Sequence, residues 1–496
     1  MAITAGGSLN SVVAPQQQTL ASNYIDFTSS ATAGWAQQYL PDLMEKEAEV
    51  FGKRTISGFL NQVGAEEAMT SDQVVWSEQS RLHISVKGTV AVSGSTNGTF
   101  TVTSDIDGNN ASSSPAFTLA NHGVRASDVV LIASAGIVTQ CLVVDSDTAV
   151  IQVEPYDKAD LTGHATTTGG STLLVVGSEH AKGTAYLDGN GSAADSRTPA
   201  NEATFKSFTN KPIILKDYYE ISGSDASRIG WVEVSTEEGS GGYLWYLKAE
   251  ADTRARFTDY LEMAMLESVV GSNSTVVDTT LGASSDSGVG TQGLFAAITD
   301  RGNITSGVTG VNAAVDLAEF DAILAEFDNQ GAIEENMMFV NRATSLAMDD
   351  MLASMNSYGA GGTSYGVFDN SEDMALNLGF SGFRRGSYDF YKSDMRYLND
   401  KATRGGINAA ATSAAIRGVI VPAGVSSVYD EMLGKNMKRP FLHVRYRASQ
   451  TDNRKLKTWT TGSVGAATSA LDAMQMHFLS ERCLITQGAN NFMLMK

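Results

Sequence analysis

The residue types that usually carry chemistry in proteins are few in this chain, and their spacing matches none of the common site motifs. Six histidines occur, and no two of them stand at the i, i+4 spacing of a helical zinc pair. They are His83, His122, His164, His180, His443 and His477. Two cysteines, Cys141 and Cys483, are too few for a disulfide scaffold, and we expect both to be small buried apolar groups. The sequence therefore predicts no metal site and no bound cofactor.

One acidic turn is the segment nearest to a metal-binding motif. Asp105 and Asp107, followed by Gly108 and Asn109, resemble the start of a calcium loop. An EF-hand loop also needs a bidentate Glu at its twelfth position, and Ala116 stands there. We therefore interpret the segment as a hairpin turn. The phosphate-binding loop and the nucleophile elbow are missing as well, so no catalytic residue is expected and an enzyme is disfavoured.

Basic side chains gather near the C-terminus of an acidic chain. The 496 residues carry 35 Lys and Arg against 55 Asp and Glu, which gives a net charge of −20. Residues 429–496 reverse this sign with a net charge of +5, so the first 428 residues carry −25. The basic cluster comprises Lys435, Lys438, Arg439, Arg445, Arg447, Arg454, Lys455 and Lys457. Such a cluster can bind nucleic acid, but the acidic remainder favours pairing with another copy of the chain.

The elements that would position these residues change in character along the chain. Residues 1–34 contain a single charged residue and are predicted to form an extended arm or a disordered leader, followed by a helix over 35–54. Between 83 and 206, short β-branched runs alternate with turn residues, which predicts a small antiparallel barrel or sandwich without helices. The strands predicted in this module cover residues 84–92, 129–133, 137–144, 149–153 and 173–176.

A long helix is predicted over residues 242–270, with Gly271 as its C-terminal stop. Apolar residues at 3- to 4-residue spacing, with one longer step, mark its expected buried stripe. The stripe consists of Leu244, Leu247, Ala251, Ala255, Leu261, Met265 and Val269. Four charged residues lie off it, namely Arg254, Arg256, Asp259 and Glu262.

Further elements follow towards the C-terminus. A second helix is predicted to start at Asp316, which forms a capping box with Glu319, and Val315 with Phe320 fits a hydrophobic staple. Its predicted buried face is Leu317, Phe320, Leu324 and Phe327, and Gly331 follows its end. A strand over 337–340 leads through the N-cap residue Asn341 into a third helix over 342–355. Other strands are predicted at 387–392, 416–421, 441–447, 483–486 and 491–495, with a helix at 467–478.

Several C-terminal segments resemble the ending of the major capsid proteins of tailed bacteriophages. They are Arg417–Gly424, Arg439–Arg447, Asp452–Arg454, Trp459–Gly462, Ser480–Cys483 and Gly488–Asn491. The order of parts, from arm to long helix to mixed α/β region, is also similar to this family, whose fold is named after phage Hong Kong 97. Within the family, these segments resemble the ending of capsid proteins from large podophages, a set that includes the crAss-like group.

The resemblance implies an α+β fold of the Hong Kong 97 type with an inserted all-β module. Such a fold has an N-terminal arm, an extended loop, a long spine helix, and peripheral and axial domains. The implied divisions are the arm at 1–34, the first helix and rising strand of the extended loop at 35–82, the inserted module at 83–206, the returning strand at 207–240, the spine helix with part of the peripheral domain at 241–290, the axial domain at 291–428, and the rest of the peripheral domain at 429–496.

The same resemblance implies a major capsid protein that assembles into the hexamers and pentamers of an icosahedral phage head. The implied partners are other copies of the chain and other virion proteins, such as portal, scaffold or decoration proteins. The shell would enclose double-stranded DNA without sequence-specific binding and without a membrane. The implied location is the virion, assembled in the host cytoplasm.

Three groups of residues are candidates for contacts between subunits. The first is an apolar run with two adjacent tyrosines on the extended loop, for which an ordinary hairpin core is the alternative. It comprises Pro212, Ile213, Ile214, Leu215, Tyr218 and Tyr219. The second is the set of four off-stripe charges on the long helix, for which a solvated helix face is the alternative. The third is the basic cluster within 435–457.

Two other functions stay open at this point. One is another self-assembling virion component, such as a tail or portal-associated protein, although tail-tube proteins are mostly β and lack a long spine helix. The other is a nucleic-acid-binding protein that uses residues 435–457, whose binding would weaken as the salt concentration rises.

Overall fold

The computed structural model describes the chain in two compact units, each treated by itself below. The described residues are 59–60, 65–79, 81–92, 98–113, 117–134, 136–146, 149–157, 161–164, 170–180, 182, 205–224, 244–271, 280–281, 289–331, 333–356, 382–423, 425–430, 435–464 and 467–496. The smaller unit includes Lys216–Tyr260 and Thr458–Phe478. The larger unit includes Gly58–Leu215, Leu261–Lys457 and Leu479–Lys496.

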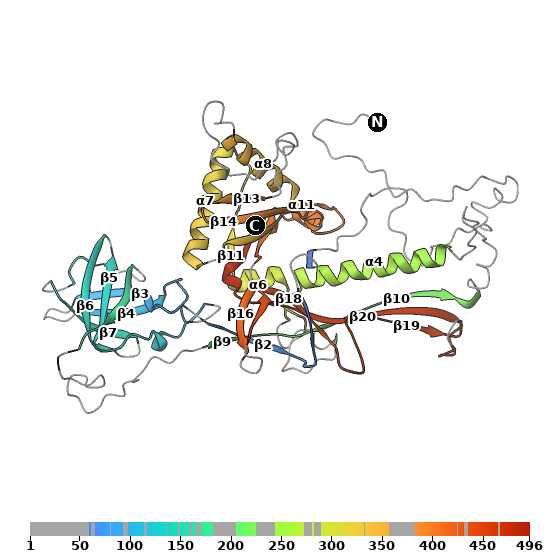
Figure 1. Ribbon diagram of the computed structural model, residues 1–496, viewed down its shortest axis with the longest axis horizontal. Helices are drawn as coiled ribbons and strands as arrows, with labels where there is room; N and C mark the ends of the chain where they lie inside the picture. Colours follow the sequence, from blue (N-terminus) through green and yellow to red (C-terminus); the bar gives the residue numbers. More distant parts are fainter. Residues whose placement is uncertain are drawn as a thin grey trace. The chain divides into compact units, whose positions relative to one another are not determined.

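A closed, six-stranded antiparallel barrel lies within the larger unit (Figure 1). Its strands are β3 (Ser85–Val92), β4 (Gly98–Asp105), β5 (Asp128–Ser134), β6 (Ile137–Ser146), β7 (Val150–Pro155) and β8 (Ser171–Ser178). They close in the order β3-β4-β7-β6-β5-β8. Alternate residues point inward, so that Phe100, Val130, Ile132 and Ile151 fill a core without solvent exposure. The sequence predicted a barrel or a sandwich here, and the structure has the barrel.

Two paired strands connect the barrel to the rest of the chain. Strand β2 (Val74–Gln79) runs antiparallel to β9 (Phe205–Asn210), in register from Val74 opposite Asn210 to Gln79 opposite Phe205. The chain therefore enters and leaves the barrel through one two-stranded stem. This pair falls on the predicted rising and returning strands of the extended loop. Before it, β1 (Ala65–Met69) runs parallel to β18 (Leu442–Arg447).

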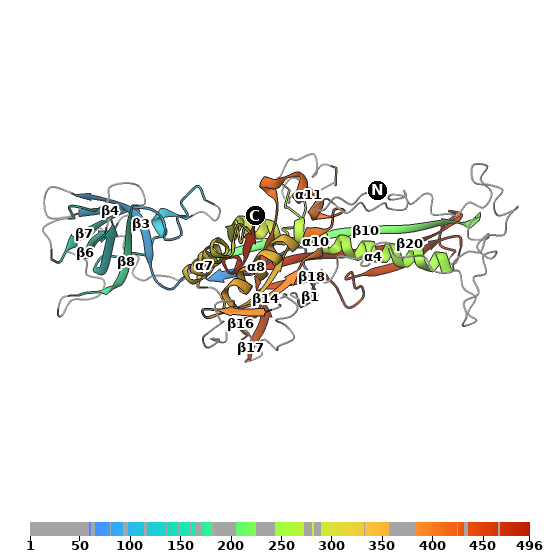
Figure 2. The same ribbon diagram turned by 90° about the horizontal axis from the view of Figure 1, so that it is seen from above.

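The smaller unit contains a helix beside an extended sheet (Figure 2). Helix α4 (Leu244–Glu267) runs along β10 (Ile213–Ser222) and β20 (Ala473–Thr486), and β19 (Lys457–Gly462) pairs with β20. The ring of Phe257 on α4 packs against that of Phe478 on β20, with centroids 6.0 Å apart. Strand β20 is longer than this unit, and its C-terminal part pairs with β18 in the larger unit.

The long helix was predicted, but its buried stripe was only partly right. The buried side chains are spaced by four, at Thr253, Phe257, Leu261 and Met265. Ala251 is exposed, and Val269 is 68% exposed because the helix ends at Glu267, before the predicted stop at Gly271. The stripe therefore follows the residues that face the sheet, and it includes a threonine whose hydroxyl donates to the Ala249 carbonyl at 2.8 Å.

The predicted helix over 467–478 is wrong. Residues 473–478 are the first part of strand β20, and the described residues before them are irregular. Ala, Met and Gln favour a helix locally, but propensity is a weak preference that tertiary packing overrides. In the sheet, Phe478 is 2% exposed against α4, and the backbone pairs with neighbouring strands.

A six-stranded mixed sheet forms the centre of the remaining α/β region (Figure 1). Its order is β11 (Asn303–Thr305), β21 (Met493–Met495), β15 (Gly418–Pro422), β12 (Glu335–Val340), β14 (Tyr388–Asp394) and β13 (Gly382–Arg385). Helices α7 (Ala313–Gln330) and α8 (Arg342–Asn356) pack beside it around a core that includes Phe320, Phe327, Met338 and Phe390. The strands predicted at 337–340, 387–392, 416–421 and 491–495 all fall in this sheet.

Helix α7 begins earlier than predicted. Its N-cap is Asn312, whose side chain accepts hydrogen bonds from the amides of Ala314 and Val315. The predicted cap Asp316 is buried instead and accepts from the Gly310 amide at 2.8 Å, while Glu319 accepts from the Thr309 amide at 2.7 Å. The two carboxylates therefore hold the preceding turn. Gly331 ends the helix at a φ of 66°, as predicted.

The shorter described elements complete the larger unit. They are η2 (Leu119–Asn121), α6 (Leu294–Arg301), α10 (Arg396–Asn399), α11 (Arg404–Ala410), η5 (Thr412–Ala414), the antiparallel pair β16 (Val425–Asp430) and β17 (Lys435–Pro440), and η6 (Ala489–Asn491). No helix among the described residues is both long and apolar enough to cross a membrane. The predicted arm at 1–34 and helix at 35–54 lie outside the described residues.

Candidate inter-subunit surfaces

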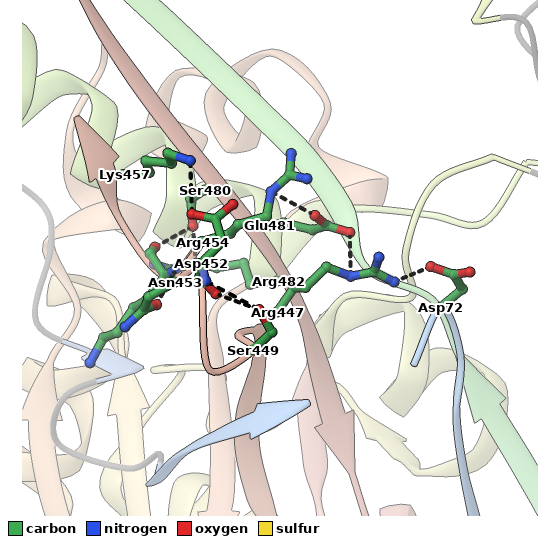
Figure 3. Close-up of polar contacts among 11 residues, drawn as sticks. Asp72, Arg447, Ser449, Asp452, Asn453, Arg454, Lys457, Ser480, Glu481 and Arg482 are labelled. Carbon is green, nitrogen blue, oxygen red and sulfur yellow. Dashed lines mark hydrogen bonds and ion pairs between the residues drawn. The ribbon is translucent and has the colours of Figure 1, made fainter. Parts of the chain in front are cut away.

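The basic C-terminal cluster lies around strand β18 and the turn that follows it (Figure 3). Its centre is Glu481 on β20, a carboxylate whose side chain is 7% exposed. One carboxylate oxygen is 3.1 Å from Nε of Arg447, and the other is 3.0 Å from Nε of Arg454. Neither contact has the direction of a good hydrogen bond, so both are ion pairs held by charge. Arg447 also pairs with Asp72.

The other described basic side chains also have acidic partners in the same chain. Arg445 pairs with Glu67 at 2.8 Å, and Lys455 pairs with Glu66, because β1 runs parallel to β18 and brings its two glutamates alongside. Lys457 pairs with Asp452 at 2.7 Å on the surface. The five described side chains of the cluster are therefore paired within the chain, which the sequence analysis did not foresee. A further contact of these side chains with a neighbouring subunit stays a prediction.

The other basic residues in or beside the cluster are Lys435, Lys438, Arg439 and Arg482. The structure describes the backbone of Lys435, Lys438 and Arg439 in β17 but not their side chains. Arg482, which the sequence analysis did not select, is buried and donates to the Ser480 hydroxyl at 2.9 Å and to the Lys455 carbonyl at 2.8 Å. Burial lowers the pKa of the Arg482 guanidinium, and the nearby carboxylate of Glu66 opposes that shift.

The four charges predicted off the helix stripe do not share one environment. Arg254 is exposed, and Arg256 pairs with Asp217 of β10 at 3.3 Å. Asp259 is partly exposed. Glu262 is only 6% exposed and accepts a hydrogen bond from the Phe59 amide at 2.7 Å, so its placement off the buried side was wrong. The Glu262 carboxylate therefore makes its contact within its own chain. Arg254 is the most solvent-exposed residue of the four.

The apolar run of the extended loop lies mostly on β10, where successive side chains alternate between two faces. Ile213, Leu215 and Tyr219 are partly buried on one face, and Pro212 before the strand is partly buried too. Ile214 and Tyr218 on the other face are 51% and 55% exposed. Strand β10 stands at the end of its sheet in the described part of the chain. The run is therefore neither a fully buried hairpin core nor fully solvated.

An aromatic stack on the exposed face of the same sheet was missed by the sequence analysis. The ring of His477 on β20 lies between Trp459 on β19, at 5.1 Å, and Tyr218 on β10, at 6.0 Å. Its Nε2 is 2.7 Å from the Thr461 hydroxyl. The three rings come from distant segments, and only cross-strand pairing brings them together, so no spacing along the sequence indicates the stack.

A buried arginine fixes the stem of the extended loop and was also missed. Arg301, at the end of α6, lies over the ring of Phe208 at 4.3 Å and over that of Trp76 at 5.6 Å. Its guanidinium is 3.3 Å from the carboxylate of Glu78 on β2. Burial lowers the pKa of Arg301, and Glu78 acts in the opposite direction. The contact joins both stem strands to the α/β region.

The residues considered for chemistry have structural roles where they are described. Asp105 accepts from the Asn109 amide at 2.7 Å and so closes a turn, while Asp107 pairs with Arg81 at 3.0 Å. Burial raises the pKa of Asp107, and Arg81 opposes the shift. Among the described residues, no group of three metal-ligating side chains is close enough to hold an ion.

His164 and the two cysteines are also buried residues of types that often carry chemistry. His164 has its ring nitrogens 2.7 Å from the Ser134 hydroxyl and 2.9 Å from that of Thr139, inside the barrel wall. The second nitrogen thus meets a hydroxyl where a catalytic dyad would place a carboxylate. Neither Cys141 nor Cys483 forms a disulfide, and both are fully buried, as predicted. Burial raises the pKa of the Cys483 thiol to about 12.

Comparisons with known proteins give matches among solved structures. No family model matches the chain, and no curated protein matches it. A structure from Microbacterium phage Oxtober96 is 10% identical, with 93% of this chain and 98% of that chain covered at a TM-score of 0.36. The mature capsid of bacteriophage PhiM1 is 10% identical, with 63% and 78% covered at 0.32. The capsid of cyanophage P-SCSP1u is 8% identical, with 64% and 78% covered at 0.31. At low identity, the chain is thus similar to structures of phage capsids.

Proposed function

We propose that this chain is the major capsid protein of a tailed phage, which assembles through copies of itself into the hexamers and pentamers of an icosahedral head around double-stranded DNA. The observation that carries the proposal is β10, a ten-residue strand at the end of its described sheet that exposes apolar side chains. A monomer has no evident use for such a strand, whereas a shell subunit has a neighbour to cover it.

Strand β10 is an edge strand of its sheet in the described part of the chain. An unpaired edge presents backbone donors and acceptors to another chain, and monomeric proteins usually protect long edges with charge, proline or a covering loop. On the exposed face of β10, Ile214 and Tyr218 are each about half exposed and alternate with the charged Lys216 and Glu220. Burying each of them further contributes about 1 kcal/mol. One such contact is weak, but every subunit of a closed shell repeats it.

The architecture supports the same proposal. A two-stranded stem carries an inserted barrel, a helix of 24 residues follows, and a mixed α/β region completes the chain. This order is the one that the sequence resemblance implies for extended loop, spine helix and axial domain. Portal, scaffold or decoration proteins are the further partners of such a subunit, and the virion, assembled in the host cytoplasm, is its place.

The nucleic-acid alternative loses its main support. Its binding surface was the basic cluster, and five of those side chains have acidic partners within the chain: Arg445, Arg447, Arg454, Lys455 and Lys457. Binding a phosphate backbone there would first break these pairs. A protein that encloses DNA without gripping it is compatible with a chain of net charge −20.

Electron microscopy of the purified full chain tests the proposal, alone and with the product of the neighbouring gene. We expect round shells of uniform size. The variant Ile214→Asp should fold, because the side chain is exposed, but it should fail to assemble, since a charge would be buried at the contact. Lys216→Ala on the same face is the matched control and should assemble. A monodisperse monomer under every condition would refute the proposal.

A further inference from the structure

The exposed face of β10 carries its charges in an order that is complementary to itself. Its successive side chains are Ile214, Lys216, Tyr218 and Glu220. Tyr218 therefore has a positive charge two residues before it and a negative charge two residues after it. The side-chain amide of Gln475 on β20 donates to the Glu220 carboxylate at 2.7 Å and holds it in this row. An antiparallel copy of the strand can place each lysine opposite a glutamate.

The backbone of these same residues points to the open edge of the sheet. The amide of Gly223, directly after β10, donates to the Asp472 carbonyl next to β20 at 3.0 Å. Because successive amides point to opposite sides of a strand, the even-numbered residues direct theirs away from β20. The Tyr218 amide accordingly donates to the carboxylate of its neighbour Asp217, at 2.9 Å. Beyond that edge, the described part of the chain places no further strand.

Tyr218 is also the last ring of the aromatic stack. The stack runs from Trp459 through His477 to Tyr218, which lies on the strand at the end of the described sheet. With His477 against it, Tyr218 is still 55% exposed. An antiparallel copy of β10 would bring a second Tyr218 beside the first, and aromatic pairs across two strands are favourable.

One two-fold register pairs opposite charges across two copies of β10. When Tyr218 lies opposite Tyr218 of the second copy, Lys216 lies opposite Glu220 on both sides of the axis. An axis at Lys216 or at Glu220 sets like charges opposite each other, and an axis at Asp217 does the same with two carboxylates. An axis at Tyr219 leaves both lysines without an opposite charge. The charges therefore select the register that is centred on Tyr218.

We propose that β10 pairs with β10 of a second copy as antiparallel edge strands, about a two-fold axis at Tyr218. The inference rests on the proposed function, in which a neighbouring subunit covers β10, and it names the segment of that neighbour and its register. Main-chain hydrogen bonds supply the attraction in such a strand addition. The Tyr218 amide must first leave Asp217, so we expect weak pairing in the free chain. Other contacts between subunits raise its occupancy.

A cysteine scan of the full chain tests the register. In the proposed pairing the two Cα atoms at position 218 are about 5.5 Å apart, which a disulfide can bridge. Those at position 216 are offset along the strands by roughly 14 Å, which it cannot. Under mild oxidation, Tyr218→Cys should give about fivefold more disulfide-linked dimer than Lys216→Cys, and a mixture of Lys216→Cys with Glu220→Cys should link again. The native Cys141 and Cys483 are buried and do not interfere.

Charge reversal tests the same contact without a cross-link. Lys216→Glu alone sets glutamates opposite each other, and Glu220→Lys alone sets lysines opposite each other, so each should weaken self-association in sedimentation about tenfold. An equal mixture of the two variants places a lysine opposite every glutamate and should restore it. Lys216→Ala removes an exposed attraction without adding repulsion, so it should weaken self-association by about twofold at most.

The outcomes separate this inference from the proposed function. A dimer yield of Tyr218→Cys no higher than that of Lys216→Cys would overturn the inference, even if round shells form. Self-association of Lys216→Glu alone that equals the wild type would overturn it as well. If Tyr218→Cys dimers form and the mixture of charge variants associates, but the chain never makes shells, the strand pairing stands and the proposed shell fails.

Discussion

The replacement Glu481→Gln should loosen the junction of β18 and β20. The wild-type carboxylate is the shared partner of Arg447 and Arg454, and its side chain is 7% exposed, whereas those of the two arginines are 27% and 28% exposed. Removing one partner of a fully buried pair costs about 3–5 kcal/mol. Because water reaches the two guanidinium groups here, we expect a smaller loss of about 2 kcal/mol.

Amide hydrogen exchange is the appropriate assay, since it reports the local opening of these strands and needs no two-state unfolding of the whole chain. A loss of about 2 kcal/mol corresponds to roughly thirtyfold faster exchange in β18 and in the C-terminal part of β20. Gln keeps the volume of the side chain, so the effect measures the lost charge. The difference should persist at high salt, because buried pairs are poorly screened.

The matched control is Asp452→Asn, which removes an exposed pair in the same region (Figure 3). The side chains of Asp452 and Lys457 are 44% and 42% exposed, so we expect no measurable change in exchange. If Glu481→Gln and Asp452→Asn give the same exchange rates as the wild type, Glu481 does not hold the cluster together and the reasoning is wrong.

Three further outcomes are expected. Asn312→Ala should destabilise α7 by about 1 kcal/mol, seen as faster amide exchange in its first turn, because the cap is lost. Gly88→Ala should weaken the barrel, since a Cβ there would lie 2.2 Å from the Thr101 carbonyl oxygen, while Gly177→Ala meets open space and should leave exchange in the barrel unchanged. The Cys483 thiol, with its pKa raised to about 12 by burial, should stay protonated at pH 8 and react with a thiol reagent only after unfolding; fast reaction in the native protein would contradict its burial.

Local sequence patterns predicted strands and helix ends correctly where one apolar face or one turn residue determines the local structure. The β-branched runs between turn residues predicted five of the six barrel strands but missed β4. Gly331 and Asn341 marked helix ends correctly. The start of α7 was misplaced because two carboxylates three residues apart fit the pattern of a capping box in two different situations. The first of them can cap the helix, or it can bind the turn before the helix, as Asp316 does.

The candidate site depended on information that is not local. The sequence shows that Arg445 and Lys455 are basic, but not that β1 runs parallel to β18 and brings Glu67 and Glu66 beside them. Likewise, Glu262 reads as a solvated charge on an amphipathic helix until its partner, the Phe59 amide, is known. Cross-strand contacts such as the stack at His477 join segments hundreds of residues apart, so only the fold reveals them.

The two-stranded stem has a consequence for how this chain tolerates change in length. Gln79 lies opposite Phe205, so the segment between them is a closed loop whose ends are fixed by β2 and β9. The entropic cost of closing a loop grows only slowly with its length, and the barrel inside this loop has its own core. Over evolution, such a loop can gain, lose or exchange a whole folded module while the register of the stem stays the same. The stem is thus a natural point of modular exchange, at which lineages can differ in what they carry without redesigning the rest of the subunit.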